Sequence, residues 1–462
     1  MDGSQTVSPF LRGNFAPVRS EDDFELKVTG EMPRGLAGSL YRNGPNPQFE
    51  PDADYHWFVG DGMVHGFHVE DGKVRYSNRY VRTPKWRLEN QAGRRLFNTW
   101  GDPRKTDPAA MGQDGGVANT NIVWHGGRLL ALEEAHRATQ MDPLTLETQG
   151  YVDLGGKVTA HPKIDPDTGE MVFFAYMDDP MPFSTKVSYG VADAAGRLTR
   201  RETFEAPYCS MIHDFMVTRN HVLFPVLPLT GDLPRAMSGG PAFAWEPDKG
   251  AFVGVMRRDA GVETIRWFNI EANYVFHVMN AWEDGDRIFA DVMQYECAPL
   301  FPKADGGRGD PAQARLCRWT FDLAGGSDHI KRDYIDDLAG EFPRFDERRS
   351  GLTYRHGWFA AQTARSAEIR PDAIAHIDLA IGKRATYELP AGDAISEPVF
   401  TPRSASADEG DGWLVAVAYR AQTDRSELLV FEAQDVAAGP VATAEVPRRV
   451  PFGFHGNWRP AV

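Results

Sequence analysis

The sequence predicts an all-β fold: a seven-bladed β-propeller with a cap of loops and short helix over one face. Three observations predict it. Short apolar or alternating runs that end in Gly, Asp or Asn recur along the whole chain, a pattern typical of strands and hairpins. Helical periodicity is scarce, and 45 glycines and 32 prolines among 462 residues supply many turns. Grouped by hairpins, the runs form seven units, at a spacing typical of four-stranded propeller blades.

The seven units follow one another in the order expected for blades. They begin with GMVHGFHVEDGKVRYSNRYV (62–81), GRLLALEEAHRATQMDPLTLETQGYVDL (127–154), GEMVFFAYM (169–177), NHVLFPVLPL (220–229), DRIFADVMQYE (286–296), RHGWFAAQT (355–363) and GWLVAVAY (412–419). A second strand-like stretch follows each of the last five, such as VSYGVADAAGRLTRRETF (187–204) after the third. Two stacked β-sandwiches use the same hairpins and remain the alternative.

No linker divides the chain, so we expect residues 1–462 to form a single domain. Three longer, less regular insertions lie between the units, near 83–117, 229–243 and 299–315. The first could hold a short helix around 87–97. Long insertions in a compact all-β chain are often functional lids, so these three segments are the expected cap.

Composition narrows the possible partners and location. The formal charge of −15 and the absence of a basic run argue against nucleic acid as a partner. Cys209, Cys297 and Cys317 have neither disulfide nor zinc spacing, which suits a reducing compartment. We find no signal sequence and no apolar run of about 20 residues, so a cytoplasmic protein is expected. No sequence feature indicates an oligomeric state.

Four of the 13 histidines share one context. They are His161 in VTAHPKID, His213 in SMIHDF, His277 in VFHVMNAW and His455 in FGFHGNW. Three precede a strand unit, and the fourth follows the last unit, near ring closure. If the first strand of each blade lines the axis, four imidazoles could converge there and hold a metal ion. For any one of them alone, a hydrogen-bonded core histidine is the simpler interpretation.

Other histidines and three carboxylates complete the list of candidates. Glu134, Glu341 and Glu397 are flanked by apolar residues, and a carboxylate of this kind commonly orients a metal-bound imidazole. Surface salt bridges are the alternative for each. Six histidines beside turns are expected to be solvated: His56, His125, His136, His221, His329 and His376.

These histidines and glutamates lie in stretches that resemble the carotenoid cleavage oxygenase family, which includes lignostilbene and isoeugenol-type dioxygenases. The resemblance extends from residue 40 to residue 458 in family order. Its most specific stretches are TAHPKIDPDTGEM (159–171), MIHDF (211–215) and FHGNW (454–458). Others are LYRNGPNPQF (40–49), FVGDGMVHGF (58–67), VANTNIVWHGGRLLALEE (117–134), FHVMNAWE (276–283), EFPRFD (341–346), SEPVFTPR (396–403) and EGDGW (409–413).

The resemblance implies a cofactor and a reaction. It implies one non-haem Fe(II) per chain, held by His161, His213, His277 and His455, with no organic cofactor. It implies that Glu134, Glu341 and Glu397 hydrogen-bond His213, His277 and His455 respectively, and that Thr120 lies beside the open iron position. The implied reaction is O2-dependent cleavage of a conjugated C=C bond, in an apocarotenoid, stilbenoid or other aryl alkene, to two carbonyl products.

The chain departs from the stilbene- and isoeugenol-cleaving branch at two positions. Where that branch has a Tyr and a Lys that bind a substrate phenol, this chain has Trp100 and Glu133. Neither supplies the missing hydroxyl or positive charge. We therefore expect a substrate that needs no activation through a phenol, with both residues lining its site. For Trp100, packing within the cap is an equal alternative.

The resemblance also implies a tunnel through which the substrate reaches the iron. The residues at the mouth of this tunnel are the least determined part of the site. Leu300 and Phe301 are expected to line it, and either this pair or Met181 and Phe183 could supply an apolar patch for peripheral membrane contact. Ordinary loop packing is the alternative. A different function class, a non-catalytic propeller that serves as a binding platform, also fits the fold, because fold alone does not set function.

Overall fold

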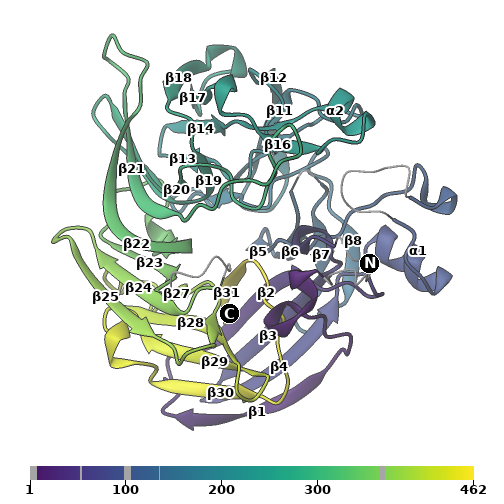
Figure 1. Ribbon diagram of the computed structural model, residues 1–462. Coiled ribbons are helices and arrows are strands. Elements are labelled where there is room, and N and C mark those ends of the chain that lie inside the picture. The colour runs from purple at the N-terminus through teal and green to yellow at the C-terminus, as the bar shows by residue number, and fades with distance from the viewer. Residues whose placement is uncertain (1–7, 53–54, 98–105, 135, 364–369, 462) are drawn as a thin grey trace.

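The strands form small sheets arranged in a ring, the seven-bladed propeller that the sequence predicts (Figure 1). This computed structural model describes residues 8–52, 55–97, 106–134, 136–363 and 370–461. Each of the seven strand units supplies central strands of one blade, in chain order. The alternative of two β-sandwiches is wrong, because the sheets follow one another around one ring instead of stacking in two pairs.

Blades I to IV use residues 23–270 and the last strand of the chain. Blade I contains β31 (Gly456–Pro460), β2 (Gly38–Pro45), β3 (Gly62–Glu70), β4 (Lys73–Tyr80) and β1 (Asp23–Gly30). Blade II contains β5 (Asn121–His125), β6 (Arg128–Leu132), β7 (Thr139–Met141) and β8 (Thr148–Tyr151). Blade III contains β9 (Lys163–Ile164), β10 (Met171–Tyr176), β11 (Lys186–Ala192) and β12 (Leu198–Glu205). Blade IV contains β13 (Met216–Val217), β14 (His221–Val226), β17 (Ala251–Arg257) and β18 (Arg266–Ile270).

Blades V to VII complete the ring. Blade V contains β19 (Tyr274–Asp284), β20 (Arg287–Tyr295), β21 (Arg315–Asp322) and the first part of β22 (Lys331–Phe345). Blade VI contains the rest of β22, β23 (His356–Ala361), β24 (Ala373–Asp378) and β25 (Lys383–Glu388). Blade VII contains β26 (Ala394–Ile395), β27 (Val399–Pro402), β28 (Gly412–Arg420), β29 (Arg425–Glu432) and β30 (Ala442–Val446).

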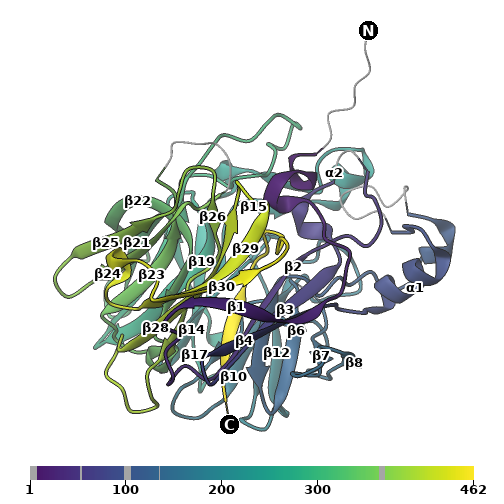
Figure 2. The same cartoon turned by 90° about the horizontal axis from the view of Figure 1, so that it is seen from below.

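The two ends of the chain close the ring together. The C-terminal strand β31 pairs with β2, and the N-terminal strand β1 pairs with β30 as well as β4. In both views the purple N-terminal strands therefore lie beside the yellow C-terminal ones (Figures 1 and 2). This double pairing places the segment before β31, which carries His455, at the inner edge of blade I.

The core lies between the blades, and this explains the apolar runs in the sequence. All but the last residue of β28 are buried, because a middle strand is covered by neighbouring blades on both faces. The outer strand β12 is mostly polar and half-exposed. Large aromatic side chains such as Trp319, Trp358 and Tyr274 fill the space between blades and are almost fully buried. The stacked blades make a rigid frame around the axis.

The helix of the first insertion is displaced from its predicted position. We expected it around 87–97, but α1 spans Pro84–Ala92. The hydroxyl of Thr83 accepts a hydrogen bond from the Trp86 N–H, and Pro84 occupies the first turn, so the helix begins earlier. Gly93 ends it in the left-handed conformation, with φ +65°.

The second insertion contains short strands and a short helix, and the third is irregular. The second contains β15 (Leu229–Gly231), α2 (Leu233–Met237) and β16 (Phe243–Trp245). In the third, Lys303 forms an isolated bridge with Trp245, so the second and third insertions are in contact. Within the described part of the chain, none of the helices has the length and hydropathy of a membrane-spanning segment.

Candidate metal centre

Four buried histidines lie at the inner edges of four blades. His161 lies just before β9, His213 just before β13 and His455 just before β31, whereas His277 lies within β19. Each is 8% exposed or less. In β19 the pairing with β20 shifts on both sides of Val278, and this irregularity accompanies the inward position of His277.

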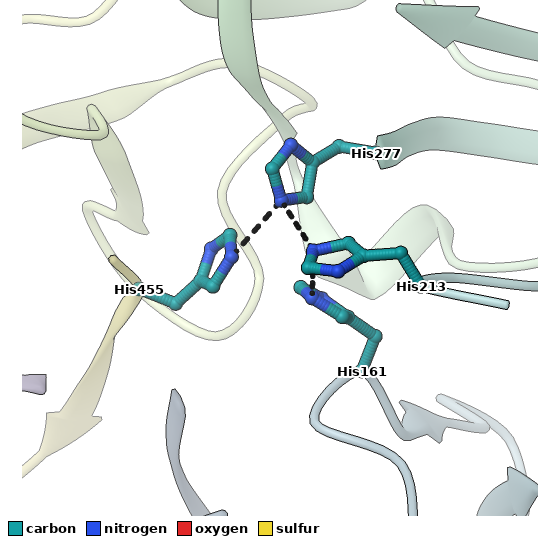
Figure 3. Close-up of side chains that lie close together, drawn as sticks. All are labelled: His161, His213, His277 and His455. Atoms are coloured by element: carbon teal, nitrogen blue, oxygen red, sulfur yellow. Dashed lines mark hydrogen bonds between the residues drawn. The ribbon is translucent and has the colours of Figure 1, made fainter. Parts of the chain in front are cut away.

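The four imidazoles meet at their Nε2 atoms, as Figure 3 shows. The Nε2–Nε2 distances are 3.1 Å from His161 to His213, 3.2 Å from His213 to His277 and 3.0 Å from His277 to His455. The four ligand atoms all lie within 4.8 Å of one another. The residues come from blades III, IV, V and I, so the ring itself creates this cluster.

Carboxylates from the remaining three blades contact three of these rings from behind. Glu341 accepts a hydrogen bond from Nδ1 of His277, and Glu134 contacts Nδ1 of His213. Glu397 accepts one from Nδ1 of His455 at 3.0 Å. Among the described residues, His161 has no carboxylate partner. Each of the seven blades thus contributes one residue of the set, Glu134 from II, Glu341 from VI and Glu397 from VII.

This arrangement fits a metal cation. A carboxylate can only accept a hydrogen bond, so Nδ1 of each paired histidine carries the proton and Nε2 presents its lone pair to the centre. Lone pairs that face one another at such distances repel unless a cation lies between them. A metal–nitrogen bond of about 2.1 Å places two ligand atoms at right angles about 3.0 Å apart, close to the observed spacings. An all-imidazole donor set suits iron, zinc, copper or nickel.

The electrostatic surroundings favour neutral imidazoles at two of the positions. Burial, assisted by the neighbouring imidazoles, lowers the pKa of His161 well below its ordinary value. Burial also lowers the pKa of His455 to about 4, although Glu397 opposes this. At Glu397 burial opposes ionisation, but the Arg344 guanidinium and His455 bring its pKa down to about 2. Glu397 is therefore an anion that accepts from a neutral His455.

Asp214 connects three of the histidine segments. It directly follows His213, and its Oδ1 lies 2.7 Å from Nζ of Lys163, two residues beyond His161. Its Oδ2 accepts a hydrogen bond from the backbone N–H of Val278 at 2.9 Å, next to His277. This buried carboxylate therefore holds the inner edges of blades III, IV and V in register.

Polar side chains also tie His455 to its neighbours. Asn457 donates to Asn121 Oδ1 at 3.1 Å, and Asn121 donates to the carbonyl of Ala160, beside His161. On the other side, Arg344 donates to the Gly456 carbonyl at 3.0 Å and to Asn457 Oδ1 at 2.9 Å. These contacts fix the segment around His455 against blades II, III and VI.

A cavity of about 380 Å³ opens onto three of the histidines: His213, His277 and His455. Its volume lies within the range of about 300–1,000 Å³ common for small-molecule sites. Aromatic side chains dominate the wall near the histidines: Trp57, Phe58, Phe276, Phe342 and Phe454. The cavity therefore offers flat apolar surfaces directly beside the metal centre.

The predicted substrate-side residues occupy different places. Thr120 lines the cavity, donates from Oγ1 to Asn119 Oδ1 at 2.9 Å, and accepts at its carbonyl from the His455 N–H at 3.1 Å. Leu300 lines the cavity and is 38% exposed. Phe301 does not line it, because its ring turns inward against Phe58 and is 1% exposed. Trp100 lies outside the described residues.

Glu133 lines the cavity beside Glu134, but it is engaged differently. Its Oε2 accepts hydrogen bonds from the backbone N–H groups of Val117 and Ala118. Nearby, Nε2 of His136 lies 3.0 Å from Asp114 Oδ1. The expectation that His136 is solvated is therefore wrong, because it is half-buried and forms an ion pair with Asp114. His125 and His376, also expected to be solvated, are buried.

Several cavity residues escaped sequence reasoning. Phe276 and Phe454 line the cavity because each directly precedes a clustered histidine, so the F-H pairs in VFHV and GFHG are the signal that could have found them. Tyr176 donates to Glu134 Oε2 at 2.6 Å from the end of β10, and Arg370 lines the cavity in blade VI. Neither carries a local sequence signal, because only the ring brings them to the cavity.

Comparison with known proteins gives the family. Residues 15–460 match the family described as retinal pigment epithelial membrane protein, and the chain belongs to this family of carotenoid cleavage oxygenases. The chain is 39% identical over 468 residues to the isoeugenol monooxygenase of Pseudomonas putida, with 98% of each protein covered. It is 37% identical over 475 residues to lignostilbene-alpha,beta-dioxygenase isozyme III of Sphingomonas paucimobilis, covering 98% of this chain and 97% of that protein.

Solved structures agree with the family assignment. The crystal structure of the Pseudomonas brassicacearum lignostilbene dioxygenase matches with a TM-score of 0.94 at 34% identity, covering 98% of this chain and 99% of that one. These relatives are named oxygenases or dioxygenases, and the family is enzymatic. The dioxygenases of the family depend on iron, which is among the metals that the four-histidine set suits. The alternative of a non-catalytic binding platform therefore loses its support.

Proposed function

We propose that this chain is an iron-dependent oxygenase that uses O2 to cleave a conjugated C=C bond of a small aryl alkene or apocarotenoid to two carbonyl products. The observation that carries the proposal is the convergence of four histidine Nε2 atoms at the end of an aromatic cavity. His161, His213, His277 and His455 would hold one Fe(II), and Glu134, Glu341 and Glu397 would fix the rings. When bound, the iron supplies the activation of O2; no organic cofactor is required.

The protein's own part in this reaction is to orient and enclose the alkene. Trp57, Phe276 and Phe454 form flat walls against which a planar conjugated substrate can lie with its double bond beside the histidines. The hydrogen bonds of Thr120 to Asn119 and to the His455 backbone hold it at the cavity wall. We infer that Thr120 limits how closely the substrate approaches the metal centre, while the aromatic side chains exclude bulk water.

Among substrate classes, stilbenoids and other aryl alkenes have the stronger support. The isoeugenol monooxygenase and the lignostilbene dioxygenases named above are the relatives that favour them. A membrane contact at Met181, Phe183 and Leu300 remains a prediction. Leu300 is exposed beside the cavity, and Phe183 packs against the cavity-lining Phe243.

We further propose that residues 1–462 act as one domain in the cytoplasm. The ring closes only when β31 from the C-terminus pairs with β2 from the N-terminal part, so neither half can complete the propeller alone. Cys209, Cys297 and Cys317 are free thiols, which suits a reducing compartment.

A substrate panel with product analysis tests the proposed function. Purified protein loaded with Fe(II) is incubated under O2 with trans-stilbene, trans-4-hydroxystilbene, an aryl propene and an apocarotenal. We expect aldehyde products from at least one, with one iron per chain by elemental analysis. With iron bound at that ratio, absence of aldehyde from every substrate would refute the reaction.

A further inference from the structure

We propose that Glu133 is the polar anchor for the substrate, accepting a hydrogen bond from a neutral hydroxyl group on one end of an aryl alkene. The inference rests on the proposed function and deepens it, because it names the substrate class: aryl alkenes with an un-ionised hydroxyl. The preferred ligand is then neither a phenolate nor a carboxylate.

The backbone places Glu133 where it can fulfil this role. It is the first residue after β6, and Glu134 follows it directly. Glu134 turns to the back of His213 and to Tyr176, while Glu133 turns to the segment 117–118; both line the cavity. One peptide unit therefore joins the anchor to Glu134, which contacts the candidate ligand His213.

One carboxylate oxygen of Glu133 is left for a ligand. Oε2 accepts from the N–H groups of Val117 and Ala118, whereas among the described residues no donor is bonded to Oε1. A carboxylate has about four acceptor sites, and leaving them unused away from bulk water costs free energy. A hydroxyl that enters the cavity can supply the missing donor.

The neighbouring charges decide which donor fits. The carboxylates of Glu133 and Asp114 raise the pKa of His136 to about 9 against the effect of burial, so His136 is an imidazolium at neutral pH. His136 thus carries one positive charge beside the carboxylates of Glu133 and Asp114. Burial raises the pKa of Glu133, but His136 and the Ala118 and Val117 N–H groups favour its ionised form. Of these three side chains only Glu133 lines the cavity, so a ligand at this position meets a carboxylate, which disfavours a phenolate or carboxylate and accepts from a neutral donor.

The local packing makes this arrangement specific. The Gly116 N–H donates to Asp114 Oδ1 at 2.9 Å. A Cβ atom at Gly116 would lie 2.4 Å from Cε1 of His136, so only glycine lets the imidazole pack against this backbone. The same backbone continues into the Val117 and Ala118 N–H groups that hold Oε2. Asp114, His136 and Glu133 are thus organised around one short segment.

Ligand binding without O2 tests the anchor independently of catalysis. Dissociation constants are measured by tryptophan fluorescence on the iron-loaded protein under anaerobic conditions at pH 7. The ligands are trans-4-hydroxystilbene, trans-4-methoxystilbene and trans-stilbene-4-carboxylate. We expect the hydroxyl compound to bind about tenfold more tightly than the methoxy compound, and the carboxylate to bind most weakly.

Two variants test the acceptor oxygen. Glu133→Leu should bring the hydroxyl-to-methoxy ratio to about one, because the acceptor is gone. Glu133→Gln has a single amide oxygen, which the Val117 and Ala118 N–H groups hold, so a donating NH2 group takes the place of Oε1. This variant should also lose the hydroxyl preference, and it should bind the carboxylate compound better than the unaltered protein does. Glu388→Gln, at an exposed position of β25, is the control and should match the unaltered protein.

Three outcomes overturn the anchor: equal affinities for the hydroxyl and methoxy compounds, an unchanged ratio in Glu133→Leu, or no detectable binding of any of the three. The proposed function fails in a different way. Selective binding of the hydroxyl compound without any aldehyde under O2 would contradict the reaction and leave the anchor standing. Cleavage without selectivity would contradict only the anchor.

Discussion

Two histidine–carboxylate contacts, one on the ring axis and one near Glu133, stabilise opposite charge states of the same side chain. His455 lies 3.0 Å from Glu397, and His136 lies 3.0 Å from Asp114. Burial lowers the pKa of His455 to about 4, whereas carboxylates on both sides raise that of His136 to about 9 despite its own burial.

The difference shows that the contact distance does not set the charge of the imidazole. Glu397 shares its charge with Arg344, 3.4 Å away, and His455 is surrounded by other imidazoles. At His136 the effects of Glu133 and Asp114 together outweigh the opposing effects of burial and of Lys157. The neutral His455 can serve as a metal ligand, whereas the cationic His136 balances the charges of Glu133 and Asp114.

Removing an imidazole from each region should give the largest difference between the two regions. His455→Ala deletes one of the four converging Nε2 atoms, so we expect bound iron to fall to a small fraction of one per chain. His136→Ala should retain full iron, because its ring lies outside the cluster. Elemental analysis of both variants, with circular dichroism to check folding, measures this. Full iron in His455→Ala would exclude it as a ligand.

Replacing the carboxylate behind the metal centre should have the next largest effect. Glu397→Gln keeps the shape but loses the charge that fixes the Nδ1–H tautomer of His455. We expect iron affinity to fall about 10- to 100-fold, in keeping with the effect of such orienting groups. Titration against a competing chelator gives the affinity, and Glu388→Gln is the matched surface control. Unchanged affinity in Glu397→Gln would show that Glu397 does not orient the ligand.

The connection between three histidine segments should show a smaller effect on stability. Asp214→Asn removes the charge that pairs with Lys163 while keeping an oxygen for the Val278 N–H. Because Asp214 is buried and Lys163 is 23% exposed, we expect a loss of about 1–3 kcal/mol in unfolding free energy and several-fold weaker iron binding. Urea unfolding of metal-free protein measures the first. A stability loss with unaltered iron affinity would mean that Asp214 supports the ring but does not position the ligands.

The seven blades and the four histidines on the axis could be predicted from the sequence. Seven strand units could be read because both faces of strands such as β28 are buried, which leaves continuous apolar runs. The four histidines stood out because each lies at the inner edge of a blade. The family resemblance then supplied the glutamate pairing and the metal, which neither spacing nor periodicity could give.

The surroundings of Glu133 could not be predicted in the same way. Asp114, Gly116 and His136 lie in irregular segments, and their proximity to Glu133 depends on how two turns pack together. His376 escaped for a related reason: its ring bonds the buried His356 at 3.0 Å across neighbouring strands, although the sequence around it resembles a surface turn. Side-chain contacts between loops, or between neighbouring strands, leave no recurring pattern in the sequence. The buried strands that line the axis do leave one.

The positive charge of His136 predicts a small, pH-dependent effect on stability, which tests directly whether this side chain is cationic. Its pKa is about 9 in the folded protein and about 6.5 ordinarily, so its contribution is fully present below about pH 6.5 and is lost as the pH rises through about 9. His136→Gln retains a hydrogen-bonding group but cannot carry the charge. We therefore expect the variant to unfold about 2 °C below the unaltered protein at pH 6 and to match it near pH 10. Thermal unfolding of both proteins from pH 6 to 10 measures this, since other titrating groups change equally in the two and cancel in the difference. A difference that stays constant over this range would mean that His136 is neutral and does not compensate the charges of Glu133 and Asp114.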